Sequence, residues 1–437
     1  MQKSSLNQHW KLSHHLGSLM ESISGGTDRP EKVNLPHDAM LAMKRSPDSP
    51  SGANTGYFEG ENICYIKEFT IPAAEKDKVH YLYFDGVYTN PSFVINGAFV
   101  KKFHHGYVPC CMRIDKYIRY DEPNVLKVSI RGTALPNSRW YSGQGIYRDA
   151  WLLTGDRLHI SQDGLHVTTL DCSEELAQIE VTADVWNEGP SAREGYAELT
   201  VLDGSGKVVA ERKARFYADA NGKVLVRQRL TLDKPNLWDV DSPNLYSVKC
   251  RLTDRGTGET VDCEEAAFGI RKLQLDSKYG LRINGRVVKL KGGCVHHDNA
   301  FLGAVSVEDA EVRRVRLHKS MGYNAIRTAH NPPSTALLNA CDRLGLLVMD
   351  EFTDIWTEGK TAYDYSEYFP ECFEEDVERV VRRDYNHPSI ILWSIGNEID
   401  YPNHPYVTPL FQEVLGNNDA NKPAAERMYD VRKPDAG

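Results

Sequence analysis

The stretch that decides the fold is SIILWSIGNE, residues 389–398. It is an apolar run that ends in two polar residues, Asn397 and Glu398. Three earlier segments also end an apolar run in polar groups: VVKLKGGCVHHD (287–298), NAIRTAHN (324–331) and LLVMDE (346–351). Helical patterns separate the four segments. Near-continuous apolar strands that alternate with helices are typical of a parallel sheet covered by helices.

The helices between these strands have recognisable ends. We expect Ser306 to cap the first helix, because serine hydroxyls accept hydrogen bonds from the first helical N–H groups. The second helix is expected to start at Ser334. Gly345 is a good stop for the second helix. The third helix ends before Pro388, and its acidic run 374–376 is expected to be solvated at the helix N-terminus.

Polar, titratable side chains follow all four predicted strands. They are His296 with Asp298, Arg327 with His330, Asp350 with Glu351, and Asn397 with Glu398. Active sites of (β/α)₈ barrels form at the C-terminal ends of several strands. An open doubly wound sheet could also bind ligands at this edge. No strand is followed by a glycine-rich phosphate loop, so the barrel is favoured.

The chain before residue 275 has a different pattern of apolar and polar residues. Short runs alternate apolar and polar residues with a period of two, as in 126–131 and 179–185, which is the pattern of half-buried strands. Asn-Gly and Asp-Gly pairs between the runs suit tight hairpins. We predict a multidomain β plus α/β protein, with a β-sandwich at 1–158, a second β-sandwich at 159–272 and part of a barrel at 273–437.

Composition excludes several classes of function. Lys and Arg number 52 against 61 Asp and Glu, so the formal charge of −9 provides no basic surface for nucleic acid. There is no apolar stretch of about 18 residues that would span a membrane. Nine cysteines are scattered over the chain, an odd number that indicates reduced thiols. We therefore expect a cytoplasmic protein that binds neither nucleic acid nor membranes.

Glu398 is the strongest candidate for a catalytic residue. A carboxyl group directly after an apolar strand can have its pKa raised by desolvation and act as a proton donor. Alternatively, Glu398 is a structural partner of an arginine across the barrel mouth. His330 is either a satisfied loop histidine or a donor to substrate. His296, His297 and Asp298 could bind a metal ion, but they lack the spacing of a helical metal motif, and we expect no metal.

Several motifs together resemble glycoside hydrolase family 2. They are WSIGNE (393–398) with RDYNHPS (383–389) before it, IRTAHNPP (326–333), DEF (350–352) and NSRWYSGQGIYR (137–148). The resemblance implies a jelly-roll-like sugar-binding domain, an immunoglobulin-like domain and a catalytic TIM barrel. Within the family the chain looks most like bacterial β-galactosidases, with β-glucuronidases and β-mannosidases as relatives.

The resemblance also implies roles for individual residues. In a retaining mechanism two carboxyl groups flank the glycosidic bond, and Glu398 matches the general acid/base. Asn397 matches the residue that binds the sugar 2-hydroxyl. The remaining residues expected to bind substrate are His330, His296, Asp298, Asp350, Asn137 and Ser138. The family's galactosidases often hold Mg²⁺ near the acid/base, but WTEG (356–359) occupies that region here, so we expect no required metal and no cofactor.

The predicted barrel is short. A full barrel takes roughly 250 residues, and the strands that would carry the nucleophile are expected beyond residue 437. We therefore expect an incomplete form of a retaining glycosidase that cleaves terminal β-galactosides, as a homo-oligomer or with a complementing C-terminal half. No Arg/Lys cluster is evident that would bind a uronate carboxylate, which favours galactosides. A β-glucuronidase or β-mannosidase, or a non-catalytic carbohydrate-binding fragment, is the alternative.

Overall fold

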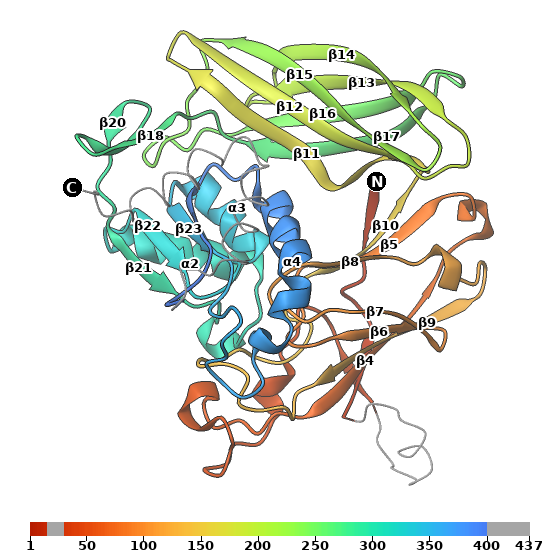
Figure 1. Ribbon diagram of the computed structural model, residues 1–437, viewed down its shortest axis with the longest axis vertical. Coiled ribbons are helices and arrows are strands. Elements are labelled where there is room, and N and C mark those ends of the chain that lie inside the picture. The colour runs from red at the N-terminus through yellow and green to blue at the C-terminus, as the bar shows by residue number, and fades with distance from the viewer. Residues whose placement is uncertain (15–29, 400–437) are drawn as a thin grey trace.

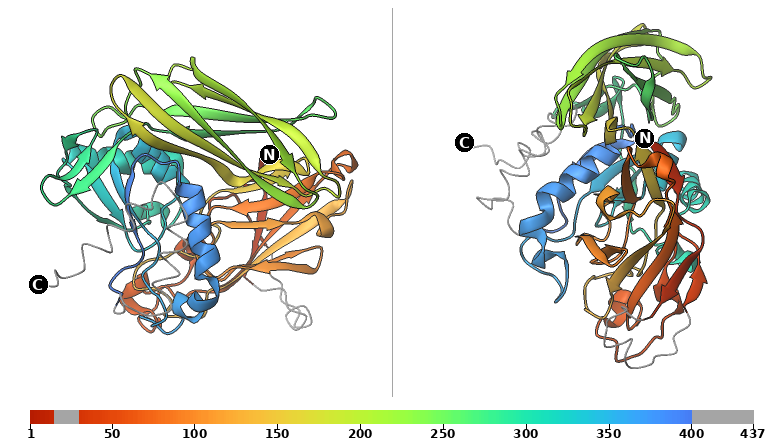
Figure 2. Two further views of the ribbon diagram at one scale, coloured as in Figure 1. Left: turned by 45° about the horizontal axis from the view of Figure 1, so that its top comes forward. Right: turned by 90° about the vertical axis from the view of Figure 1, so that its right-hand side faces the viewer.

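The computed structural model describes residues 1–14 and 30–399. Figure 1 shows three regions in chain order: a β region from red to orange, a second β region from yellow to green, and an α/β region from green to blue. In both views of Figure 2 the second β region lies across the other two. No helix in the described part of the chain is long and apolar enough to cross a membrane.

The first region contains two antiparallel sheets around one core. The four-stranded sheet has the order β1 (Gln2–Ser5), β10 (Ala150–Gly155), β5 (Val79–Phe84), β8 (Cys110–Arg113). The six-stranded sheet has the order β3 (Glu31–Val33), β2 (Trp10–Ser13), β4 (Asn62–Thr70), β9 (Pro123–Arg131), β6 (Ser92–Ile95), β7 (Ala98–Lys102). The apolar positions of β9 are Leu126, Val128 and Ile130, and all three are fully buried, as the alternation predicts. Asn96 and Gly97 adopt positive φ between β6 and β7, so this predicted hairpin is confirmed.

The second region is a sandwich of two antiparallel sheets. One sheet has the order β11 (Leu158–Cys172), β12 (Leu176–Asn187), β15 (Gly222–Asp233). The other has the order β14 (Val208–Ala218), β13 (Arg193–Leu202), β16 (Tyr246–Asp254), β17 (Thr260–Phe268). The apolar side chains of both sheets form one buried core. The three predicted domain ranges themselves stay predictions.

The third region begins with a small antiparallel sheet and continues as a partial barrel. The small sheet contains β18 (Leu273–Asp276), β19 (Gly280–Ile283) and β20 (Arg286–Val287). The partial barrel is a parallel sheet of β21 (Gly292–Val295), β22 (Ala325–Thr328), β23 (Leu347–Glu351) and β24 (Ile390–Ser394). The helices between these strands are α2 (Glu308–Ser320), α3 (Thr335–Leu344) and α4 (Phe369–Asp384). Short 3₁₀ turns are η1 (Ala39–Ala42), η2 (Gly52–Thr55), η3 (Ala73–Glu75), η4 (Asp115–Tyr117), η5 (Ala300–Leu302) and η6 (Tyr365–Glu367).

The expected start of the first parallel strand was wrong. Val287 does not lead into this strand but pairs with Arg282 in the small sheet. The reason is the turn at Asn284 and Gly285, where both residues have positive φ and join β19 to β20. The parallel strand is β21, which starts only at Gly292.

Two of the expected helix features also change. The second helix was expected to start at Ser334 and stop at Gly345, and α3 does so, with Gly345 in the left-handed conformation. Ser334 caps α3 by accepting a hydrogen bond from the N–H of Leu337. Ser306, in contrast, does not cap α2; its hydroxyl bonds to Glu311 and Ser334. Within the acidic run of α4, Asp376 is buried rather than solvated.

Candidate active site

The polar ends of the parallel strands converge on one carboxylate, that of Glu351. Its side chain is fully buried, and it accepts hydrogen bonds from Arg327 Nη2 at 2.6 Å and from Ser394 Oγ at 2.7 Å. His330 Nδ1 lies 2.7 Å from the other oxygen, Glu351 Oε1. These residues come from β22, β23, β24 and the loop after β22, so the carboxylate joins three neighbouring strand ends.

Asp350 lies on the opposite face of the same strand. Successive side chains of a strand point to opposite faces, so Asp350 faces α4, where its neighbours are Asp384 and Arg383. Burial raises the pKa of Asp350 well above its ordinary value, and the Asp384 carboxylate raises it further. The structure therefore removes Asp350 from the expected substrate-binding set, because its carboxyl is buried behind the sheet.

Asn397 is fixed from two sides. Its amide nitrogen donates to Asp354 Oδ1 at 2.7 Å, and its amide oxygen accepts from Arg327 Nη2 at 2.8 Å. Its backbone N–H donates to the carbonyl of Thr353 at 3.0 Å. The residue before Glu398 is thus held by the same hydrogen-bond network that binds His330 through Glu351.

Asp354 brings two cations to this network. Arg139 binds it with two hydrogen bonds, of 2.8 and 3.1 Å, and Lys360 Nζ lies 3.0 Å from Oδ1. Burial opposes ionisation of Asp354, but the hydrogen bonds from Arg139, Asn397 and Lys360 outweigh it and lower its pKa. Arg139 belongs to the segment between β9 and β10, so the first β region contributes a charged group to the barrel mouth.

Glu398 is exposed in this structure. Its backbone has a φ of 47°, and 73% of its side-chain surface is accessible. Its carboxylate lies 3.7 Å from Arg139 Nη2. The expectation of a carboxyl group desolvated by burial is therefore not met, and the ion pair with an arginine, which the sequence left open as the alternative, is present.

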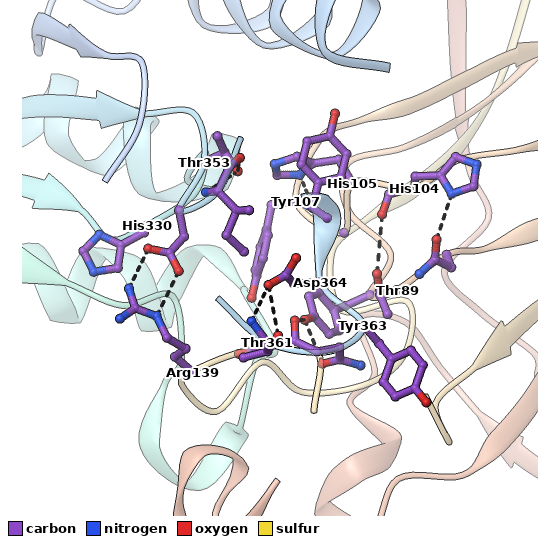
Figure 3. Close-up of a pocket in the computed structure, with 18 of the residues that line it drawn as sticks. Thr89, His104, His105, Tyr107, Arg139, His330, Thr353, Thr361, Tyr363 and Asp364 are labelled. Carbon is purple, nitrogen blue, oxygen red and sulfur yellow. Dashed lines mark hydrogen bonds and ion pairs between the residues drawn. The ribbon is translucent and has the colours of Figure 1, made fainter. Parts of the chain in front are cut away.

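A pocket lies between the first β region and the barrel loops (Figure 3). Its volume is about 550 Å³, including its open mouth, and its lining includes Asn137, Ser138, Arg139, Trp140, His330 and Asp354. Figure 3 shows Arg139 and His330 on one side of the pocket and His104, Thr89 and Tyr363 on the other. Asn137, Ser138 and His330, which were predicted from distant parts of the sequence, therefore line one pocket.

His296 lies beside Trp140, whereas Asp298 lies outside the pocket. The Trp140 ring is 5.0 Å from the ring of His296 and 5.6 Å from that of His330. Burial lowers the pKa of His296, and the neighbouring His330 lowers it further. Asp298 does not line this pocket; its backbone carbonyl accepts a hydrogen bond from Arg314. Across residues 1–14 and 30–399, no group of three or more His, Cys, Asp or Glu side chains is arranged to hold a metal ion.

Comparison with known proteins assigns the chain to a family. The family model "Glycosyl hydrolases family 2, TIM barrel domain" matches residues 276–415, and the model "Glycosyl hydrolases family 2" matches residues 158–271. The chain belongs to glycosyl hydrolase family 2. The first matched range covers the partial barrel, which contains Glu351 and Asn397. The second covers the β-sandwich of the second region.

Relatives within family 2 are about twice as long as this chain. The chain is 38% identical to "Beta-galactosidase BoGH2A" of Bacteroides ovatus over 400 residues, which are 91% of this chain and 46% of the relative. A crystal structure of a family 2 member from Bacteroides cellulosilyticus matches with a TM-score of 0.89 and 35% identity, over 96% of this chain and 55% of that one. A Bacteroides uniformis β-glucuronidase matches with a TM-score of 0.77 and 27% identity, over 98% of this chain and 50% of that one.

The reasoning from sequence missed three residues of this family 2 site. Arg139 was quoted within a motif but given no role, and Asp354 and Lys360 were not singled out. Arg139 and Asp354 are 215 positions apart, so no local pattern indicates that they pair. Asp354 follows the DEF motif by two residues, and this position near a strand end is the one signal that could have drawn attention to it.

Proposed function

We propose that this chain supplies the acid/base side of the active site of a retaining β-glycosidase that acts on terminal β-galactosides. The observation that carries the proposal is the continuous network from His330 through Glu351, Arg327 and Asn397 to Asp354. It fixes the side chains next to Glu398 before any ligand binds. Pre-organised polar groups of this kind are what a glycosidase needs at the reacting sugar.

Two groups of the network, Asn397 and His330, retain a free hydrogen-bonding site for a sugar hydroxyl. The amide nitrogen of Asn397 has two N–H donors; one is bound to Asp354, and the other can donate to the 2-hydroxyl. His330 uses Nδ1 on Glu351, which leaves Nε2 for a hydroxyl in the pocket. Trp140 lies beside both histidines and offers an apolar ring face to the sugar.

In the proposed mechanism Glu398 acts twice. It first donates a proton to the glycosidic oxygen as the leaving group departs, and the sugar becomes attached to a carboxylate nucleophile. It then takes a proton from the water that hydrolyses this intermediate. We propose that the nucleophile lies in the part of the barrel that this sequence does not contain, so a longer form or a complementing chain completes the site.

The charged side chains near the pocket favour a substrate with a neutral sugar over a glucuronide. Arg139 and Lys360 are the cations that could bind a uronate carboxylate, and the sequence alone did not reveal this pair. Both are bound to the buried carboxylate of Asp354, which neutralises part of their charge. A galactoside needs no such cation, so we favour galactosides over glucuronides. We also propose a cytoplasmic location, which rests on the nine cysteines, all of which are free thiols.

The experiment that tests this proposal is a chimaera. The part of the Bacteroides ovatus relative that follows the aligned region would be fused after residue 437, and turnover of aryl β-galactosides, β-glucuronides and β-mannosides would be measured. We expect β-galactosidase activity in the chimaera, covalent labelling of the chimaera by a fluorinated galactoside, and neither result with the chain alone. A correctly folded chimaera that turns over none of these substrates, or prefers glucuronides tenfold, would contradict the proposal.

A further inference from the structure

Two buried arginines hold the loop that carries His330. Arg148 lies just before β10 in the first β region, and Arg383 lies near the end of α4. They are 1% and 8% exposed, respectively. Both contact the segment 329–334, which connects β22 to α3 and includes His330.

The contacts are made to consecutive prolines. Arg148 Nη2 donates to the carbonyl of Pro332 at 2.9 Å, and Arg383 Nη2 donates to the carbonyl of Pro333 at 2.8 Å. Proline has no backbone N–H, so neither residue can donate a hydrogen bond that would fix the loop. Both residues are buried, and buried carbonyls require donors. The two guanidinium groups supply donors to both carbonyls, and the side-chain amide of Asn331 adds a longer bond of 3.3 Å to that of Pro332.

The arginines are anchored on the first β region. Arg148 Nη1 donates to the carbonyl of Tyr107 at 3.0 Å, and Arg383 Nη1 lies 3.3 Å from Asp85 Oδ1. Asp85 directly follows β5, and it also accepts a hydrogen bond from the hydroxyl of Thr335 at 3.1 Å. Asp85 therefore ties the first β region to α4 and to the start of α3.

The charges of this cluster balance. Arg383 is paired with Asp384 by two hydrogen bonds of 2.6 Å, so Arg148 and Arg383 are matched by Asp384 and Asp85. The pKa of Asp350, the third carboxyl group here, is raised by burial and by the Asp384 carboxylate. A balanced buried cluster favours one fixed arrangement, because removing any partner leaves an uncompensated charge.

The other end of the loop is bound to the strand-end network. The N–H of Ala329 donates to the carbonyl of Val295 at 2.9 Å, and His330 Nδ1 is bound to Glu351. His330 thus lies between these contacts and the prolines held by the arginines. A displacement of Pro332 would move the His330 ring away from Glu351.

We propose that Arg148, a residue of the first β region, is a positioning residue for His330. The loss of sugar binding expected below rests on the proposed function. The expected shift of the His330 ring does not rest on the proposed function. The positioning role of Arg148 and the proposed function can therefore be refuted independently.

The test compares Arg148→Lys with Arg382→Lys in the chain as it exists. Lysine cannot bind the carbonyls of Pro332 and Tyr107 together, because it lacks the planar fork of donors. Arg382 is the control: it lies on α4 next to Arg383 and, like Arg148, bonds across regions, to Ser161 and Asp184, but it does not contact the His330 loop. Histidine labelled with ¹⁵N would report the imidazole signals, and His330→Gln would assign those of His330. Binding of a galactose-configured iminosugar would be measured by calorimetry.

We expect Arg148→Lys to move the His330 signals and to weaken iminosugar binding on the order of tenfold, since small misplacements of binding groups have large effects. Arg382→Lys should leave both unchanged. Thr335→Val, which removes only the hydroxyl bound to Asp85, should move the His330 signals less and in the same direction. If Arg148→Lys does not fold, the His330 signals of Thr335→Val test the positioning role instead.

Unchanged His330 signals in a folded Arg148→Lys, or in Thr335→Val where Arg148→Lys does not fold, would overturn the positioning role. If the unmodified chain binds no iminosugar, the proposed function fails, while the His330 signals still decide the role of Arg148.

Discussion

The amide nitrogen of Asn397 donates a hydrogen bond of 2.7 Å to Oδ1 of Asp354, and the same oxygen accepts from Arg139 of the first β region. The position of the residue next to Glu398 therefore depends on a side chain that lies more than 250 positions earlier in the sequence. The acid/base side of the site is therefore built from residues of both the first β region and the partial barrel.

Glu398→Ala in the active chimaera should slow the second half of the reaction. With a dinitrophenyl galactoside the leaving group needs little protonation, so the first step should continue while hydrolysis of the intermediate loses its base. We expect kcat to fall by roughly 10²–10⁴, and added azide to restore turnover and yield β-galactosyl azide. The exposed Glu375→Ala is the control and should retain full activity. A folded Glu398→Ala that is inactive and shows no response to azide would count against the acid/base role.

Asp354→Asn should shift the substrate preference of the chimaera toward glucuronides. The substitution removes the charge that neutralises Arg139 and Lys360, so both cations become available to a uronate carboxylate. We expect the ratio of kcat/KM for glucuronide over galactoside to rise about tenfold, which corresponds to about 1.4 kcal/mol.

Asp364→Asn is the matched control for this shift. Asp364 also lines the pocket and is buried, but it binds backbone N–H groups and hydroxyls rather than a cationic side chain. Its substitution should leave the ratio unchanged. An unaltered ratio in Asp354→Asn would show that the two cations do not face the substrate.

Glu351→Gln should destabilise the fold and weaken sugar binding together. Glu351 is fully buried and forms hydrogen bonds with Arg327, His330 and Ser394. The substitution removes its negative charge and leaves the partly buried guanidinium of Arg327 without a carboxylate partner. Breaking a buried pair costs about 3–5 kcal/mol, and we expect a loss near the lower end because Arg327 is partly exposed. Urea unfolding would measure it. Glu378→Gln, which alters an exposed ion pair with Arg382, should change the free energy of unfolding by less than about 1 kcal/mol.

His387 should make stability depend on pH. Burial lowers its pKa, but the carboxylate of Asp342, 2.5 Å from Nδ1, outweighs burial, and the pKa is raised above the ordinary 6.5. A raised pKa in the folded state stabilises the protein fully below the unfolded-state pKa, and the contribution disappears as the pH rises through the folded-state pKa. The difference in free energy of unfolding between the unmodified chain and His387→Gln should therefore be largest at pH 6 and below and shrink at higher pH. A difference that grows with pH would contradict this assignment.

The order of the regions, the four parallel strand ends and the family could all be predicted from the amino-acid sequence. These features follow from local patterns: the period of two in the sandwich strands, the apolar runs before polar pairs, and caps such as Ser334 and Gly345, whose hydrogen bonds lie within a few residues. The motifs around Asn397, His330 and Asn137 also pointed to one site, and the structure brings these three residues to one region of the barrel mouth.

Which side chains contact one another could not be predicted from the sequence, because it depends on how the regions pack together. The pleat of β23 places Asp350 and Glu351 on opposite faces, but only the packing of α4 against one face shows that Asp350 is buried away from the pocket and Glu351 binds His330. The expected burial of Glu398 could not be tested by pattern, because burial depends on which loops cover it. Arg139 with Asp354, and Arg148 with Pro332, are pairs about 200 positions apart; their contacts arise from docking one region on another, and no local signal in the sequence encodes that geometry.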